Sequence, residues 1–190
     1  MIVKREALAA ALDRPDPERR FYLFHGPDEA GARALAARLQ AALGADKFAL
    51  SASALRDDPA LLADEAAAIA LFGGPRLIWI EPAGDEIAAA VEALLGAPRV
   101  ESPVVAVAGA LRKTGALLKL VENHAQTVVA ACYAPEGADA ERMVVALGQA
   151  EGLAIDSSLA RRIAEESAGN QAIAAAEIGK FALFLNAVPD

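Results

Sequence analysis

The sequence predicts an α/β fold: a parallel five-stranded sheet flanked by helices, followed by a small all-helical domain. Short apolar runs without polar alternation recur as far as residue 134, and such runs are typical of parallel strands covered on both faces. Amphipathic segments of helical length separate them, as expected for right-handed crossover connections. The expected strands are 21–25, 48–51, 76–81, 103–109 and 127–134, and the expected helices are 29–43, 59–70, 84–96, 113–123 and 136–151.

Local signals support several helix boundaries. Asp58 precedes Pro59, which places a capping carboxylate before a proline in the first helical turn. Gly44 and Gly96 stand where helix C-terminal caps belong. These residues predict helices that start near residue 59 and end near residues 43 and 96.

The pattern changes after Gly152. Residues 157–168 and 170–185 have helical patterns with no strand between them. We therefore expect an α/β domain over residues 1–152 and a small helical, lid-like domain over residues 153–190. The chain stops soon after its last helix, which suits a complete small protein and equally a fragment of a longer one.

Composition restricts the partners and the compartment. The 190 residues carry 18 basic and 26 acidic side chains, a net charge of −8, which argues against nucleic-acid binding over the whole surface but leaves room for a local basic patch. The single cysteine, Cys132, lies in an apolar run, so we expect a core residue in a reducing, cytoplasmic compartment. No signal peptide and no membrane-spanning run is recognisable, and no membrane partner is expected.

Gly26 and Gly31 have the spacing of a phosphate-binding loop between the first strand and the first helix. A working loop also needs a Lys followed by Ser or Thr, and the sequence has Ala32 and Arg33 instead. Arg33 stands one place late for the lysine, and its planar guanidinium does not replace a compact ammonium. We interpret the loop as degenerate, with Gly26 ending the strand and Asp28 capping the helix, and expect no bound cofactor.

The acidic residues near this loop point the same way. Asp28 and Glu29 place negative charge at the helix N-terminus, where a phosphate would otherwise bind. Glu81 follows a strand at the place of a metal-binding acid, but Pro82 replaces the second acid. One carboxylate without a Ser or Thr ligand makes a weak Mg²⁺ site, so no metal site is expected.

Other catalytic arrangements are missing from the sequence. His25 and His124 are far apart and belong to no cluster with metal-ligand spacing. There is no G-x-S-x-G elbow and no G-x-G-x-x-G fingerprint. We therefore expect no catalytic residues and no intrinsic enzymatic activity.

Leu71 and Phe72 end the helix expected over residues 59–70 and precede Gly73-Gly74-Pro75. Adjacent helical residues point about 100° apart, so one buried face does not easily accept both side chains. From the residues alone, two interpretations stay open. The pair belongs to the ordinary core at the sheet edge, or it projects as an apolar plug for a pocket on another protein.

Four segments, in order, resemble the delta subunit of the bacterial DNA polymerase III clamp loader. They are residues 21–33, 69–81, 104–122 and 169–183, and the resemblance rests on their order and spacing over nearly the whole chain. That family has an AAA+-like fold with an inactive nucleotide site. Its members bind and open the ring-shaped sliding clamp, the beta subunit, and belong to the polymerase holoenzyme without hydrolysing ATP themselves.

The resemblance implies roles for particular residues. The family binds the clamp through a Leu-Phe pair at a helix end, which matches Leu71 and Phe72 and favours the partner interpretation. Arg112, Lys113 and Lys119 match a lysine-containing segment and become candidates for contacts with DNA or a neighbouring subunit, against the alternative of a solvated helix face. Lys180 is a candidate for contact with a neighbouring subunit, against the alternative of a surface lysine in the last helix. The implied partners are the clamp, other clamp-loader subunits and, within the complex, DNA.

The sequence also departs from the family in one respect, and two other functions stay open. The family carries a third, helical collar domain, and this chain stops before it, so we expect clamp binding without stable loader assembly. A divergent P-loop ATPase or kinase using Arg33 and Glu81 is one rival, and a non-catalytic scaffold is another. Titration with ATP and Mg²⁺ separates the first, and a pull-down with the cognate clamp separates the second.

Overall fold

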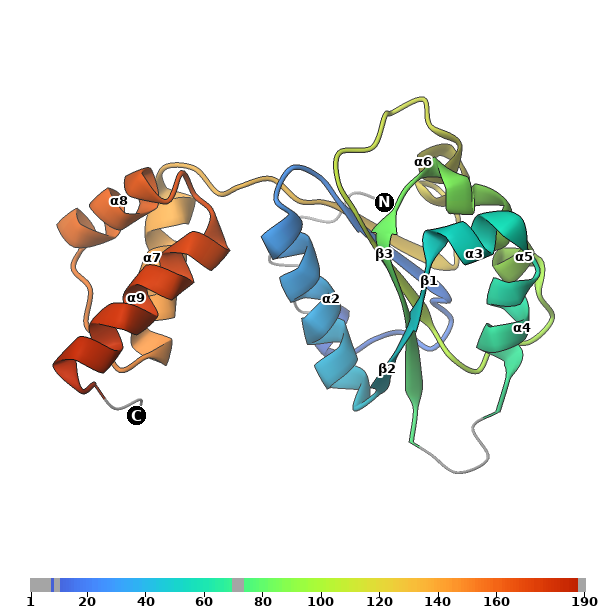
Figure 1. The fold of residues 1–190 in the computed structure, drawn as a ribbon, viewed down its shortest axis with the longest axis horizontal. Coiled ribbons are helices and arrows are strands. Elements are labelled where there is room, and N and C mark those ends of the chain that lie inside the picture. The colour runs from blue at the N-terminus through green and yellow to red at the C-terminus, as the bar shows by residue number, and fades with distance from the viewer. Residues whose placement is uncertain (1–7, 9–10, 70–73, 188–190) are drawn as a thin grey trace. The chain divides into compact units, whose positions relative to one another are not determined.

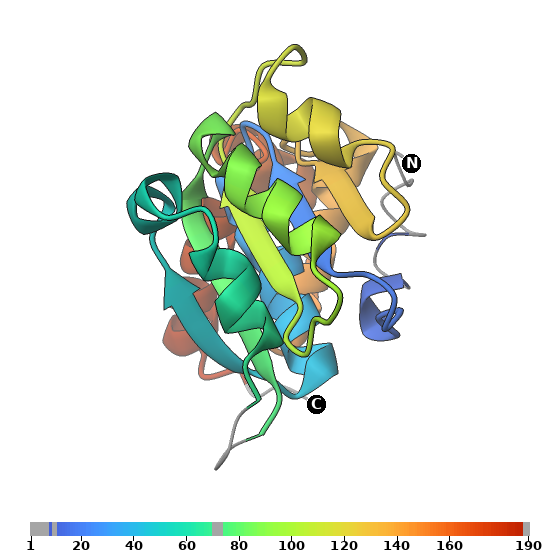
Figure 2. The same ribbon diagram turned by 90° about the vertical axis from the view of Figure 1, so that its right-hand side faces the viewer.

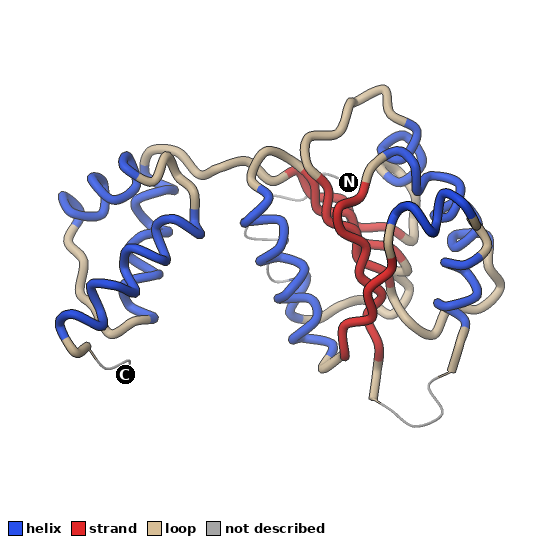
Figure 3. The backbone as a smooth tube through the Cα atoms, viewed as in Figure 1, coloured by secondary structure: helices blue, strands red, loops and turns tan. Residues whose placement is uncertain are grey.

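A computed structural model describes Leu8 and residues 11–69 and 74–187 of the chain (Figure 1). The chain divides into two compact units, Met1–Cys132 and Tyr133–Asp190. Strands occur in the first of these units, whereas the described secondary structure of the second is helical, as the colouring of Figure 3 shows. Each unit is described by itself below.

The first unit is built on a parallel five-stranded sheet, which confirms the predicted fold class. The strand order is β2-β3-β4-β1-β5, and every pairing is parallel. The chain therefore leaves the central strands for one edge and later returns to the other, as Figure 2 shows. The strands are β1 (Phe21–His25), β2 (Asp46–Leu50), β3 (Arg76–Ala83), β4 (Val104–Ala108) and β5 (Thr127–Ala131).

Helices cover both faces of this sheet. Figure 1 places α2 (Glu29–Leu43) on one side and four short helices on the other. Each side encloses its own apolar core, and the residues of β1 alternate between them: Phe21 and Leu23 contribute to one, Tyr22 and Phe24 to the other. The four short helices are α3 (Ala52–Asp57), α4 (Leu61–Ala67), α5 (Ala88–Gly96, preceded by the 3₁₀ turn η1 at Asp85–Ile87) and α6 (Ala116–Val121).

Local signals explain most boundaries and correct others. Gly44 has φ 57° and caps α2, as predicted. The strand expected over 48–51 covers 46–50 instead, because Ser51 accepts a hydrogen bond from Ala54 N and begins α3. Gly96 is the last residue of α5 rather than its cap, which is the extended Ala97. The helix expected over 59–70 is α4, which spans only Leu61–Ala67.

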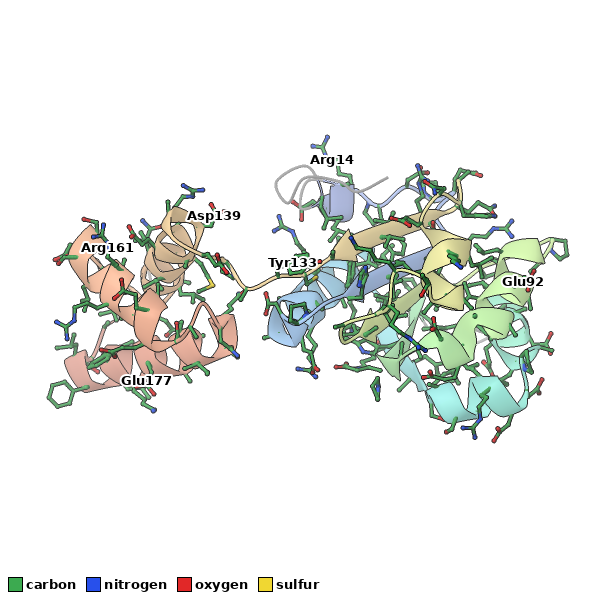
Figure 4. The ribbon with its side chains drawn as sticks, turned by 90° about the horizontal axis from the view of Figure 1, so that it is seen from above. Arg14, Glu92, Tyr133, Asp139, Arg161 and Glu177 are labelled. Carbon is green, nitrogen blue, oxygen red and sulfur yellow. The ribbon has the colours of Figure 1, made fainter. Side chains whose placement is uncertain are left out.

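The second unit consists of three described helices around a small core. They are α7 (Ala138–Ala150), α8 (Ser157–Glu166) and α9 (Gln171–Leu185), and Asp156 and Asn170 cap the last two. The boundary lies at residues 132–133, not after residue 152, because Ala140 and Val144 of α7 share one core with Ala160 and Ala164 of α8. Charged side chains project from all three helices, and Figure 4 labels Asp139, Arg161 and Glu177. Large apolar side chains of α8 and α9 are exposed as well, namely Leu159, Ile173, Phe181, Leu183, Phe184 and Leu185.

No helix among the described residues is both long enough and apolar enough to span a bilayer.

Candidate functional site

The turn after β1 requires glycine for a packing reason. Gly26 has φ 141°, and a Cβ atom placed there would lie 2.1 Å from the carbonyl oxygen of Cys132. The Gly26 amide donates to the Gly109 carbonyl oxygen at 3.1 Å, which ties the turn to the end of β4. Gly26 therefore ends the strand tightly, as interpreted from the sequence. Cys132 itself is buried, which confirms that it is a core residue.

Asp28 caps α2 from inside the turn, as the sequence indicates. Its side chain is 6% exposed, and its Oδ1 accepts a hydrogen bond from the Gly31 amide at 2.9 Å. The Ala32 amide donates to the Asp28 carbonyl oxygen at 3.0 Å. A phosphate-binding loop keeps such amides free for its anion. Here the helix already begins at Glu29, so Asp28 uses two amides that a phosphate would need.

Gly31 is required by the carboxylate of Asp28. A Cβ atom at Gly31 would lie 2.1 Å from Asp28 Oδ2, so a larger residue would displace this side chain. Asp28 Oδ2 is buried and has no hydrogen-bond partner among the described residues. The second glycine of the apparent motif thus makes room for the buried side chain of Asp28.

Arg33 and Glu81 lie together, and each is already paired. Arg33 Nε donates to Glu81 Oε1, and Arg33 Nη2 donates to Glu29 Oε2 at 2.9 Å. Trp79 Nε1 donates to Glu81 Oε2 at 2.9 Å. Burial raises the pKa of Glu81, but the hydrogen bonds from Trp79 and Arg33 outweigh it and leave this pKa below its ordinary value. The cation and the acid invoked by the ATPase hypothesis therefore meet and neutralise each other.

The two histidines lie in different surroundings. His25 ends β1, and burial lowers its pKa, with Glu122 opposing the shift. His124 accepts a hydrogen bond from the Gln126 amide through Nδ1. Across the part of the chain that the structure describes, no group of three or more His, Cys, Asp or Glu residues is placed to hold a metal ion.

Leu71 and Phe72 lie outside the described residues, but the helix before them is described. It ends at Ala67, and Ala68 is extended with ψ 130°. The expected extension to residue 70 is therefore wrong. The Ala66 carbonyl oxygen accepts from the amides of Glu101 and Ser102 at 2.8 and 3.0 Å, which ends the helix through tertiary contacts.

The other side of this segment is anchored at β3. The Pro75 carbonyl oxygen accepts from the Asp46 amide at 2.8 Å, where β2 begins. Arg76, the first residue of β3, donates from Nη2 to the Glu65 carbonyl oxygen at 2.8 Å. Sequence reasoning missed Arg76, and the available signal was a cation opening an otherwise apolar strand. Ile69, the last described residue before the gap, is 61% exposed.

Arg112, Lys113 and Lys119 are all exposed on the segment from β4 to α6. None of them forms a salt bridge with another described residue. Asp85 accepts from the Leu117 amide at 3.1 Å and holds the start of α6. Lys180, by contrast, pairs with Glu177 at 2.6 Å on α9, as a surface lysine would.

Comparisons with known proteins give structural neighbours. No protein-family model matches the sequence, and no curated protein matches it. The structure is similar to the Bacillus subtilis DNA clamp loader delta protein (YqeN), with a TM-score of 0.60 and 16% identity over 94% of this chain and 57% of that one. It is also similar to the Thermotoga maritima RuvB P216G mutant, with a TM-score of 0.61 and 15% identity over 97% of this chain and 62% of that one.

A further neighbour is the Thermotoga maritima RuvB Holliday junction branch migration motor, with a TM-score of 0.55 and 19% identity over 97% of this chain and 62% of that one. The chain thus spans less than two thirds of the length of these neighbours. At such identities the likeness establishes the fold alone. The chain has the AAA+-like fold that a clamp-loader protein and a DNA motor share.

Proposed function

We propose that this chain is a delta-type clamp-loader subunit that binds and opens a sliding clamp in DNA replication without hydrolysing ATP. The observation that carries the proposal is the glycine turn, in which residues of the chain itself engage the groups that a nucleotide would need. Asp28 accepts the amide hydrogen bond of Gly31, and Glu81 neutralises Arg33, inside an AAA+-like fold. A fold used by motors is thereby left without the groups that would bind a triphosphate.

We assign clamp binding to Leu71 and Phe72. Their position follows from the sequence: they lie between a helix that ends at Ala67 and a strand that starts at Arg76, both anchored to the body. Burying two such side chains in a partner's pocket stabilises a complex by roughly 3–6 kcal/mol before the cost of association. That range suits an anchor assisted by surrounding contacts.

Clamp opening then depends on differential affinity. A subunit that binds no nucleotide shifts the clamp between closed and open forms only by binding the open form more tightly. Energy from ATP would come from other clamp-loader subunits, which control when this surface is available. Within that complex, Arg112, Lys113 and Lys119 are free to contact DNA phosphates or a neighbouring subunit.

The chain offers a matched control for the clamp-binding pair. Leu183 and Phe184 form a second Leu-Phe pair and are 84% and 85% exposed on α9. Leu71→Ala with Phe72→Ala should abolish binding to the cognate clamp in surface plasmon resonance and leave the thermal melt nearly unchanged. Leu183→Ala with Phe184→Ala should leave clamp binding unchanged. Equal loss in both double variants, or a large loss of stability in the first, would overturn the assignment.

A divergent ATPase remains the second candidate, since Arg33 and Glu81 meet beside the glycine turn and RuvB motors share the fold. Saturable binding of ATP with Mg²⁺ in calorimetry would favour it. A chain that binds neither ATP nor the clamp would instead act as a scaffold.

A further inference from the structure

We propose that the cavity beside the amino-terminal ends of β1 and β5 binds a small organic acid, a carboxylate carried on an apolar body. The inference goes beyond the proposed function and does not depend on it, because the glycine turn follows the other end of β1. The cavity has a volume of about 720 Å³, which is within the range of small-molecule sites. Its lining comes from the segment before β1, from β1 itself, and from the turn that leads into β5.

Tyr22 on β1 supplies a buried hydroxyl that has no partner. The residue is 2% exposed, and its ring packs in the core that α2 covers. Tyr22 also lines the cavity, yet its hydroxyl forms no hydrogen bond with another described residue. Burial raises the pKa of Tyr22 to about 12, helped by Asp16 and opposed by Arg19. The phenol therefore stays protonated at neutral pH and can donate to a bound anion.

His124 supplies a second donor from the turn before β5. Its backbone is held in place, since its amide donates to the Val121 carbonyl oxygen at 3.2 Å and its carbonyl oxygen accepts from Thr127 Oγ1 at 3.0 Å. The Nδ1 atom accepts from the Gln126 amide at 3.2 Å. In the neutral ring the proton is therefore on Nε2. Among the described residues Nε2 has no acceptor, so it is available to a ligand.

The charges around the cavity favour a monoanion. Arg19 and Asp16 both line it and neutralise each other, with Arg19 Nε 3.3 Å from Asp16 Oδ2. Arg14 also lines it and forms no ion pair within the described part of the chain. Two cations and one carboxylate leave one positive charge, which matches a carboxylate better than the nearly double charge of a phosphate monoester. The Arg14 side chain extends outward in Figure 4, so it must turn inward to meet a ligand.

The other walls of the cavity are largely apolar. Leu8 and Leu12 line it from the segment before β1, and both pack in the same core as the ring of Tyr22. Val128 of β5 is half-buried and lines the cavity from the sheet. A bare anion would leave this surface in contact with water. An apolar body next to the carboxylate would cover it and add to the affinity.

The test is an amide NMR titration of the full chain with phenylacetate, a carboxylate on an aromatic body. We expect saturable shifts at the amides of Tyr22, Gln126 and Val128, with a Kd of about 1 mM or lower. Acetate lacks the apolar body and 2-phenylethanol lacks the charge, so each should bind at least about fivefold more weakly. Phenyl phosphate should also bind more weakly than phenylacetate, because its additional charge has no partner in the cavity.

Variants identify the donors. Tyr22→Phe keeps the ring and should weaken phenylacetate binding about tenfold. Tyr133→Phe is the matched control, because it changes the other tyrosine of the chain, which is 65% exposed, and it should leave binding unchanged. His124→Asn retains an acceptor for the Gln126 amide but removes Nε2, and it should weaken binding about fivefold. Arg14→Gln should weaken binding only about twofold, since this side chain is exposed.

The contradicting outcomes are distinct. No saturable shift with phenylacetate, or equal affinity in Tyr22→Phe, would overturn the inference and leave the proposed function standing. Unchanged binding in His124→Asn would also overturn it, because Tyr22 lines a neighbouring cavity of about 520 Å³ that His124 does not line. Tighter binding of phenyl phosphate than of phenylacetate would make the assigned ligand class wrong. Shifts centred on Gly26 and Gly31 would overturn the inference in favour of an anion site at the glycine turn.

Discussion

Arg33 on α2 and Glu81 on β3 form an ion pair beside the glycine turn, where a nucleotide-binding relative of this fold would bring its cofactor. Each of the two charges is thus paired within the chain, where a charge on a bound ligand would otherwise pair with it. Glu29 accepts from the same guanidinium, and Trp79 donates to the same carboxylate. The guanidinium of Arg33 and the carboxylate of Glu81 are therefore both paired with groups of the chain itself.

The ion pair predicts a pH dependence of stability. The pKa of Glu81 is lower in the folded chain than its ordinary value of 4.5. The charged carboxylate therefore favours folding above that value, and the contribution is lost as the pH falls through the folded pKa. Because Arg33 is about half exposed, the contribution should be small, about 0.2–1 kcal/mol. Urea unfolding between pH 3 and 6 should show a shallower decline for Glu81→Gln than for wild type, and identical declines would contradict the pairing.

Asp28 and Gly31 should be energetically coupled. Asp28→Ala removes a helix cap and should cost about 1 kcal/mol of unfolding free energy. Gly31→Ala alone should destabilise, because its Cβ would meet Asp28 Oδ2 at 2.1 Å. In the Asp28→Ala background the same change should stabilise by up to about 1 kcal/mol, since alanine is the better helix former. Urea titration of all four forms gives the coupling, and additive effects would refute it.

Gly26 should tolerate no side chain. Gly26→Ala combines a positive φ with a 2.1 Å approach to the Cys132 carbonyl oxygen and should cost about 3 kcal/mol or more. Gly74→Ala is the matched control, because no atom of the described residues beyond its chain neighbours lies within 4 Å of its added Cβ. That control should change the unfolding free energy by less than about 1 kcal/mol. Thermal unfolding followed by circular dichroism separates the two, and similar melting temperatures would contradict the described turn.

The basic segment should act only in the assembled complex. Replacing Arg112, Lys113 and Lys119 with glutamine should weaken DNA binding by the complex. The slope of log affinity against log salt should shrink by up to about one for each phosphate that is no longer neutralised. The net charge of −8 predicts weak binding by the isolated chain. Fluorescence anisotropy with labelled DNA at several salt concentrations measures this. A variant complex with an unchanged salt slope would leave these residues as a solvated face.

Most of the sheet was predictable because β1, β4 and the centre of β3 are apolar and buried on both faces. The glycine turn was predictable because capping chemistry is local. The end of the helix at Ala67 was not predictable, because the Ala66 carbonyl oxygen accepts from Glu101 and Ser102, which are distant in sequence, and the Glu65 carbonyl oxygen accepts from Arg76 of the next strand. The unit boundary was misplaced for a similar reason, because the pattern of residues 138–150 does not reveal which core they join. Local sequence determines where a helix can form, and tertiary contacts decide where it stops.

The central claim is that an AAA+-like body with an internally closed nucleotide site binds a sliding clamp through Leu71 and Phe72. The most direct test is calorimetric titration of the chain with its cognate clamp, with and without ATP and Mg²⁺. We predict saturable binding that is the same with and without ATP and Mg²⁺ and that is absent in the Leu71→Ala, Phe72→Ala variant. Binding that requires ATP, or that persists in the double variant, would contradict it.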